Sequence, residues 1–194
     1  MRVILLRHGQ SKGNLKRISQ GWKDWGLSKL GIEQARKAAE CLKKEGITKI
    51  FSSDLGRAKM TSEEIIKILG KELIIDKRLR EQCKGMHEGK AYNLIEERRR
   101  KLNTNKFDFT PKGGETWDKV KKRVDEFFKE IVGQGGTPLL VAHGGTFRSL
   151  LSSLFNEDIR KSDKYKHSNA GITFIDKTAD GWKITKLNDT QYLK

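Results

Sequence analysis

The sequence contains little cysteine or proline and lacks any long apolar run. Its 194 residues include two cysteines and two prolines. Cys41 and Cys83 are too few for a disulfide framework and lie in no metal-ligand spacing, which favours a reducing compartment. No apolar stretch reaches the length of about 18 residues that a membrane span needs, and the first apolar run stops at Arg7 and His8. We therefore expect a cytoplasmic protein that has neither a signal peptide nor a membrane partner.

Acidic residues are too few to balance the basic ones. The chain has 41 Lys and Arg against 25 Asp and Glu, a formal net charge of +16, which attracts anions. Nucleic acid and small phosphate esters are the two partner classes that this charge suggests. No RNA-recognition, zinc-finger or helix-turn-helix signature occurs, so we expect a small phosphorylated substrate and no nucleic acid. A basic nucleic-acid-binding protein without catalysis is the alternative from a different class.

Strand-like apolar runs alternate with amphipathic helical patterns along the chain. This alternation predicts a three-layer α/β/α fold with a mostly parallel central sheet. Strands are expected at residues 3–6, 47–52, 73–75 and 138–142, with a hairpin formed by 172–175 and 182–187. Helices are expected from a Ser28 cap to Gly46, from Arg57 to Leu69, at 92–102 and at 120–131, with a last one that contains Leu150 and Leu154.

The domain organisation is predicted to be simple. The length and the absence of repeats favour a single domain over residues 1–194. A polar, highly charged stretch at about 84–114, which ends near Gly113 and Gly114, interrupts the strand-helix alternation and is predicted to be a cap-like insertion. Both a monomer and a homodimer are compatible with the sequence.

Two predicted strands end in the same way, with a histidine followed by glycine. The first runs into Arg7, His8 and Gly9, and the strand at 138–142 runs into His143 and Gly144. The carboxyl ends of strands in an open parallel sheet line the ligand crevice, and glycine lets a ligand approach the backbone closely. We therefore expect both imidazoles to face one pocket.

A second arginine and a carboxylate follow two further strands. Arg57 comes after the strand at 47–52, and Glu81 comes after the strand at 73–75. Together with Arg7, His8 and His143 they supply what phosphoryl transfer through a covalent intermediate needs: a nucleophile, donors to the phosphoryl oxygens and an acid for the leaving group. The histidines show no metal-ligand spacing, so neither a metal nor another cofactor is expected.

The motifs around these residues resemble the histidine phosphatases with the phosphoglycerate mutase fold. The resemblance covers nearly the whole chain and rests on segments 6–14, 20–24, 27–35, 52–58 and 141–145; Gln10 departs from the family's commoner Glu. It implies that His8 is the phosphorylated nucleophile, that Glu81 is the general acid and then the base, and that Arg7, Arg57 and His143 bind the phosphoryl group. It further implies substrate contacts from Asn14, Gln20, Gly21 and Gly144.

The insertion points to a branch of this family. Phosphoglycerate mutases carry a Tyr-Gly motif there and an Arg-Arg element with a proline-rich run, which this chain lacks, so hydrolysis is favoured over mutase activity. Segments 79–90 and 109–116 look like those of the TIGAR-type fructose-2,6-bisphosphatases. That likeness implies that Lys84, Lys90 and, less directly, Lys112 bind the second phosphate of a bisphosphate. A mutase and a broad-specificity acid phosphatase remain the alternatives.

Overall fold

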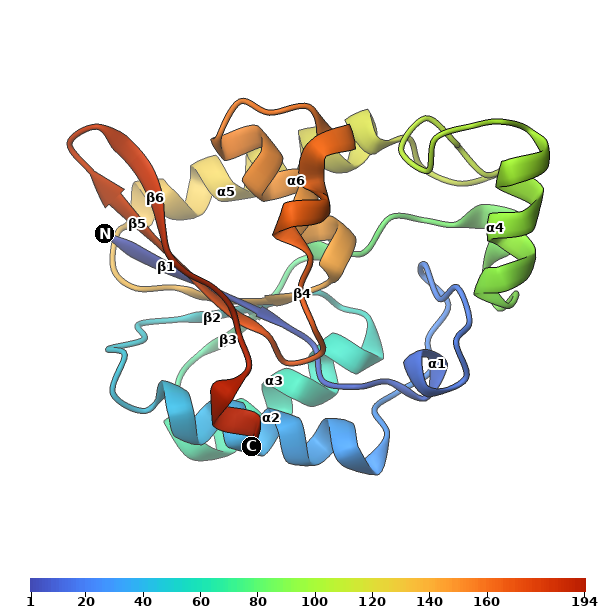
Figure 1. The fold of residues 1–194 in the computed structure, drawn as a ribbon. Helices are drawn as coiled ribbons and strands as arrows, with labels where there is room; N and C mark the ends of the chain where they lie inside the picture. The colour runs from blue at the N-terminus through green and yellow to red at the C-terminus, as the bar shows by residue number, and fades with distance from the viewer.

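The computed structural model describes all 194 residues and has a single six-stranded sheet (Figure 1). The strand order is β3-β2-β4-β1-β5-β6. The strands are β1 (Arg2–Arg7), β2 (Ile50–Ser52), β3 (Leu73–Ile75), β4 (Leu139–Ala142), β5 (Ile172–Thr178) and β6 (Gly181–Asp189). The first four run parallel, whereas β5 and β6 form the antiparallel hairpin at one edge. The predicted mostly parallel sheet and its terminal hairpin are confirmed.

Alternate residues of the central strands point to opposite faces of the sheet, as the pleat requires. Val3 and Leu5 of β1 pack with α5 (Trp117–Gln134) and α6 (Gly144–Leu154). Ile4 and Leu6 pack on the other face with α2 (Lys29–Leu42) and α3 (Gly56–Leu69). All four side chains are completely buried, so β1 lies at the centre of the predicted three-layer fold.

Helix starts agree with the sequence analysis better than helix ends do. Ser28 caps α2, because its hydroxyl accepts a hydrogen bond from the backbone N–H of Gly31 at 3.1 Å. The prediction that this helix continues to Gly46 is wrong, since α2 ends at Leu42 and the chain continues as turns. The second strand is also shorter than predicted, because residues 47–49 precede β2 without joining the strand.

The segment at 84–114 lies away from the sheet and beyond the carboxyl ends of the parallel strands (Figure 1). It contains η2 (Gly85–His87) and α4 (Tyr92–Lys101), close to α1 (Lys12–Leu15) in the picture. No residue of α4 is buried. The remaining elements are the short helices η1 (Lys77–Leu79), η3 (Ile159–Tyr165) and η4 (Gln191–Leu193). None of the helices has the length and apolar character needed to cross a membrane.

Candidate active site

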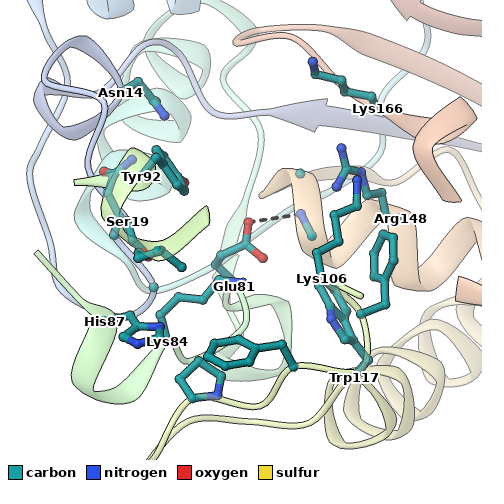
Figure 2. A pocket seen from close by; sticks show the side chains of 18 of the residues that line it. Asn14, Ser19, Glu81, Lys84, His87, Tyr92, Lys106, Trp117, Arg148 and Lys166 are labelled. Atoms are coloured by element: carbon teal, nitrogen blue, oxygen red, sulfur yellow. Dashed lines mark hydrogen bonds between the residues drawn. The ribbon is translucent and has the colours of Figure 1, made fainter. Parts of the chain in front are cut away.

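A cavity of about 550 Å³ opens where the parallel strands end, and it is lined by residues of the strand ends and of the segment that carries α4 (Figure 2). Positive charge dominates its wall. Seven lining side chains are basic: Arg7, Arg57, Lys84, Arg99, Lys106, Arg148 and Lys166; two are carboxylates: Glu81 and Glu96. A cavity with this excess of cations favours an anionic ligand.

His8 follows β1 directly and lines the cavity, although only 3% of it is exposed. Its Nδ1 lies 2.7 Å from the backbone carbonyl oxygen of Gly9. A carbonyl can only accept a hydrogen bond, so Nδ1 carries the proton and Nε2 keeps its lone pair. Burial, reinforced by the charges of Arg57 and Arg7, holds the pKa of His8 well below 6.5. The ring is therefore neutral at pH 7 and can act as a nucleophile through Nε2.

Two guanidinium groups flank this imidazole, and the backbone orients both. Arg7 donates through one terminal nitrogen to the carbonyl of His167 at 2.6 Å, and Arg57 donates to the carbonyl of Gly21 at 2.8 Å. The Nε atoms of both arginines are buried without a partner. A buried donor without an acceptor is costly, so both groups are prepared for an anion in the cavity.

Glu81 reaches the cavity from the segment after η1 and is held by two backbone N–H groups. Gln82 donates to Oε1 at 2.9 Å and Gly145 donates to Oε2 at 3.0 Å; the latter bond is dashed in Figure 2. Burial by itself raises the pKa of Glu81. The charge of Lys84 and these two backbone hydrogen bonds lower the pKa by more than burial raises it, so the net pKa lies below its ordinary value. The carboxyl group is therefore ionised at neutral pH in the free protein.

His143 directly follows β4, is the N-cap residue of α6 and does not line the cavity itself. Its ring centroid lies 5.2 Å from that of His8. Nε2 of His143 lies 2.9 Å from the hydroxyl oxygen of Ser53, whereas Nδ1 is buried without a partner. Burial, together with Arg57 and His8, holds the pKa of His143 well below 6.5. The sequence analysis missed Ser53, although it directly follows β2 in the segment that also supplies Arg57.

The other residues expected to contact substrate divide into two groups. Asn14, Gln20, Gly21, Lys84 and Gly144 all line the cavity. Lys90 and Lys112 do not: both are exposed, and their backbone carbonyls are engaged with Ser19 and Met86 respectively. The structure therefore does not place these two side chains on the wall of the substrate cavity.

Further cations line the cavity that the sequence analysis missed. Arg99 lies in α4, Arg148 lies in α6 one turn after the Gly144 start, and Lys106 and Lys166 come from loops. Arg148 could have been found, because a residue in the first turns of a helix that begins at a strand's carboxyl end lies near the crevice. The three others had no such signal. Gln10 does not line the cavity; its side chain accepts a hydrogen bond from Ser28 instead.

Comparisons with known proteins agree with this geometry. Residues 3–190 match the model of the histidine phosphatase superfamily, branch 1. The chain is 31% identical to a probable phosphoglycerate mutase GpmB of Photorhabdus laumondii and 32% identical to one of Salmonella paratyphi B, in both cases over its whole length and 95% of the relative.

Solved structures show the same similarity. The mycobacterial glucosyl-3-phosphoglycerate phosphatase in complex with VO3 superposes with a TM-score of 0.89 at 30% identity, covering 97% of this chain and 99% of that one. A phosphoserine phosphatase from Entamoeba histolytica in complex with 3-phosphoglyceric acid superposes with a TM-score of 0.86 at 25% identity, covering 100% and 99%.

Proposed function

The chain belongs to the histidine phosphatase superfamily, and we propose that it hydrolyses small phosphoglycerate-like phosphomonoesters through a phosphohistidine on His8, without a metal ion. The hydrogen bond from Nδ1 of His8 to the carbonyl of Gly9 carries this proposal. It leaves Nε2 unprotonated in a ring whose pKa is depressed by burial, and a neutral imidazole with its lone pair available is what attack on phosphorus requires.

In the first step Nε2 of His8 bonds to phosphorus while the ester P–O bond breaks. Arg7 and Arg57 stabilise the charge on the phosphoryl oxygens, and Glu81 protonates the departing oxygen. In the second step Glu81 takes a proton from water, the water oxygen bonds to phosphorus, and the N–P bond breaks. The net reaction consumes one ester and one water and releases one alcohol and inorganic phosphate.

Glu81 needs a proton for the first step, although its pKa is lowered in the free protein. A phosphate dianion beside Glu81 opposes the charge of Lys84 and so raises the pKa of this carboxyl group when substrate binds. Protonation of Glu81 therefore accompanies binding of the dianion, or the substrate enters as its monoanion and supplies the proton.

Mutase activity is the second candidate, because the GpmB-type relatives are named as probable phosphoglycerate mutases. A mutase and a phosphatase share the phosphohistidine and differ in whether a substrate hydroxyl or water accepts the phosphoryl group. The insertion lacks the mutase motifs expected from the resemblance, which favours hydrolysis.

The relatives are a better guide to the substrate class than the sequence of the insertion is. Their names refer to phosphoglycerate, glucosyl-3-phosphoglycerate and phosphoserine, so they give no support to the resemblance to TIGAR-type enzymes. Lys90 and Lys112, two of the three lysines on which fructose-2,6-bisphosphate recognition was based, lie outside the cavity wall. We therefore place 3-phosphoglycerate and its derivatives before fructose-2,6-bisphosphate.

The test is phosphate release from 3-phosphoglycerate, fructose-2,6-bisphosphate, phosphoserine and para-nitrophenyl phosphate, with wild type and His8→Ala compared. Wild type is expected to release phosphate from para-nitrophenyl phosphate and, faster, from 3-phosphoglycerate, and His8→Ala is expected to release none. Conversion of 3- to 2-phosphoglycerate faster than phosphate release would establish the mutase instead. Equal activity of the two proteins would overturn the proposal.

A further inference from the structure

Two of the cations that line the cavity share one counter-ion outside it. Nζ of Lys106 lies 2.6 Å from Oδ2 of Asp163, and a terminal nitrogen of Arg148 lies 3.6 Å from Oδ1 of the same carboxylate. Both basic residues line the cavity, but Asp163 does not. Figure 2 shows Lys106 and Arg148 side by side across the cavity from Asn14 and Tyr92.

The three residues come from different parts of the fold. Lys106 follows α4 in the segment that covers the strand ends, Arg148 belongs to α6, and Asp163 belongs to η3. The pair of cations therefore joins the covering segment to the body of the protein. An anion held between them contacts both parts at once.

The cation pair is only partly neutralised in the free protein. The Asp163 side chain is 62% exposed, whereas that of Arg148 is 20% exposed. Nε of Arg148 is buried without a hydrogen-bond partner, so part of this guanidinium has lost water and gained no acceptor. A solvent-exposed carboxylate at 3.6 Å is a weak competitor for such a group.

The surroundings of Arg148 reinforce its demand for an anion. Its positive charge is among the factors that lower the pKa of Arg7 and of Lys84, in each case after burial, the main cause. The charge of Arg148 thus opposes the charges of Arg7 and of Lys84. A ligand with a single negative centre at His8 leaves Arg148 and Lys106 without a new partner.

We propose that Lys106 and Arg148 form a subsite for a second anionic group of the substrate, and that Asp163 is the counter-ion which this group displaces. This inference rests on the proposed function, since it assumes that the phosphoryl group lies at His8. The ligand class is a phosphomonoester with a carboxylate or a second phosphate on the same small molecule. A planar guanidinium suits either group through paired hydrogen bonds.

The experiment compares 3-phosphoglycerate with glycerol 3-phosphate, which has a hydroxymethyl group where the former has its carboxylate. The readout is the ratio of kcat/KM for the two compounds in wild type, Lys106→Met and Arg148→Met. We expect wild type to favour 3-phosphoglycerate, and each variant to lower the ratio by about 10- to 100-fold, the worth of a hydrogen bond to a charged group. Arg148→Lys keeps the charge and is expected to recover part of the ratio.

Lys161→Met is the matched control, because Lys161 is an exposed lysine on the same short helix as Asp163 and does not line the cavity. It removes the same charge and is expected to leave the ratio unchanged. Asp163→Asn removes the competing carboxylate and is expected to lower the KM for 3-phosphoglycerate about 2- to 5-fold, the range of an exposed ion pair.

Fructose-2,6-bisphosphate in the same series separates the two sources of the second anion. For each compound the kcat/KM is divided by the kcat/KM for glycerol 3-phosphate. If the variants lower this ratio for the bisphosphate but not for 3-phosphoglycerate, the subsite binds a phosphate. If they lower it for 3-phosphoglycerate but not for the bisphosphate, the subsite binds a carboxylate. Equal losses on all compounds, or no loss, overturn the subsite. A KM in Asp163→Asn that stays constant or rises overturns the counter-ion role. Absence of para-nitrophenyl phosphate turnover in wild type instead counts against the proposed function itself.

Discussion

The imidazole of His143 is held through Nε2 by the hydroxyl of Ser53 at 2.9 Å. The same hydroxyl oxygen accepts a hydrogen bond from the backbone N–H of Leu55 at 3.3 Å. We expect its own proton to be donated to Nε2. The neutral ring then carries its proton on Nδ1, the buried atom without a protein partner. This tautomer supplies a donor beside His8, where the proposed phosphoryl group lies.

Ser53→Ala is therefore expected to lower kcat by about 10- to 100-fold, because loss of one preorganised donor to the transition state has about this effect or a larger one. Ser53 acts through His143 and is a positioning residue. Nitrogen NMR of the His143 ring is the readout that a purely structural role would not change. The single ring proton is expected on Nδ1 in wild type and divided between the Nδ1 and Nε2 tautomers in the variant.

Ser52→Ala is the matched control, since the neighbouring hydroxyl donates to the backbone carbonyl of Ser53 at 2.9 Å and has no hydrogen bond to the His143 ring. It is expected to leave the His143 tautomer unchanged. A wild-type ring protonated on Nε2, or an unchanged kcat in Ser53→Ala, would contradict this role.

The pH profile of the reaction is expected to be shifted to acid. The pKa of His8 lies well below 6.5, so the nucleophile stays neutral as the pH falls through 6.5 and the acid limb lies lower. The alkaline limb reflects loss of the proton that the leaving group needs, and it begins near the second pKa of a phosphomonoester, about 6. Measurement of kcat/KM from pH 4 to pH 9 checks this. An acid limb with its midpoint at or above pH 6.5 would show that the pKa of His8 is not lowered.

Protein stability is expected to fall in mild acid because of His167. Its Nδ1 donates to the carbonyl of Tyr165 at 2.9 Å and its Nε2 lies 2.7 Å from the hydroxyl of Thr173. Burial lowers the pKa of His167 to about 4. Between pH 6.5 and that value the unfolded chain binds a proton that the folded chain does not, so the free energy of unfolding decreases as the pH decreases.

By linkage this histidine alone removes about 2 kcal/mol between pH 7 and pH 5. Urea unfolding gives the free energy of unfolding of wild type and His167→Gln at the two pH values. The contribution of His167 is the loss of this free energy between pH 7 and pH 5 in wild type minus the loss in the variant. The variant is expected to lose less stability on acidification, although it starts from a lower value. An equal pH dependence in the two proteins would show that His167 titrates normally in the folded state.

Metal independence is a separate prediction. No group of three or more His, Cys, Asp or Glu side chains is arranged to hold a metal ion, and the proposed mechanism places the charge stabilisation on Arg7 and Arg57. Phosphate release is expected to be unchanged in excess chelator. A loss of activity that added Mg²⁺ or Zn²⁺ restores would require a different mechanism.

The sequence predicted the part of the site that follows directly from the strands. Val3 to Leu6 and Leu139 to Ala142 are apolar runs long enough to be recognised as buried strands, and parallel neighbours bring the residues after them to one edge. This explains why His8 and His143 could be placed together. Arg57 and Glu81 follow the other parallel strands for the same reason.

Apart from Arg148, whose helix begins at a strand end, the cations on the far wall could not be predicted in this way. Lys106 reaches Asp163 only because the segment that carries α4 folds back over the strand ends, and the spacing of Lys106, Arg148 and Asp163 in sequence carries no periodic signal. Lys90 and Lys112 illustrate the converse, since their loops have suggestive composition but the two residues are exposed and do not line the cavity. Charge in a loop indicates what a protein attracts and not where the charge will lie.

The central claim is that the phosphoryl group is transferred covalently to His8, and rapid quenching with a ³²P-labelled substrate tests this claim most directly. Wild type mixed with labelled substrate and quenched in alkali is expected to retain up to one label per chain, stable to base, lost in acid and absent from His8→Ala. Covalent label in His8→Ala, or rapid turnover by wild type without any trapped label and with inversion at phosphorus, would show that water attacks the substrate directly and would contradict the account.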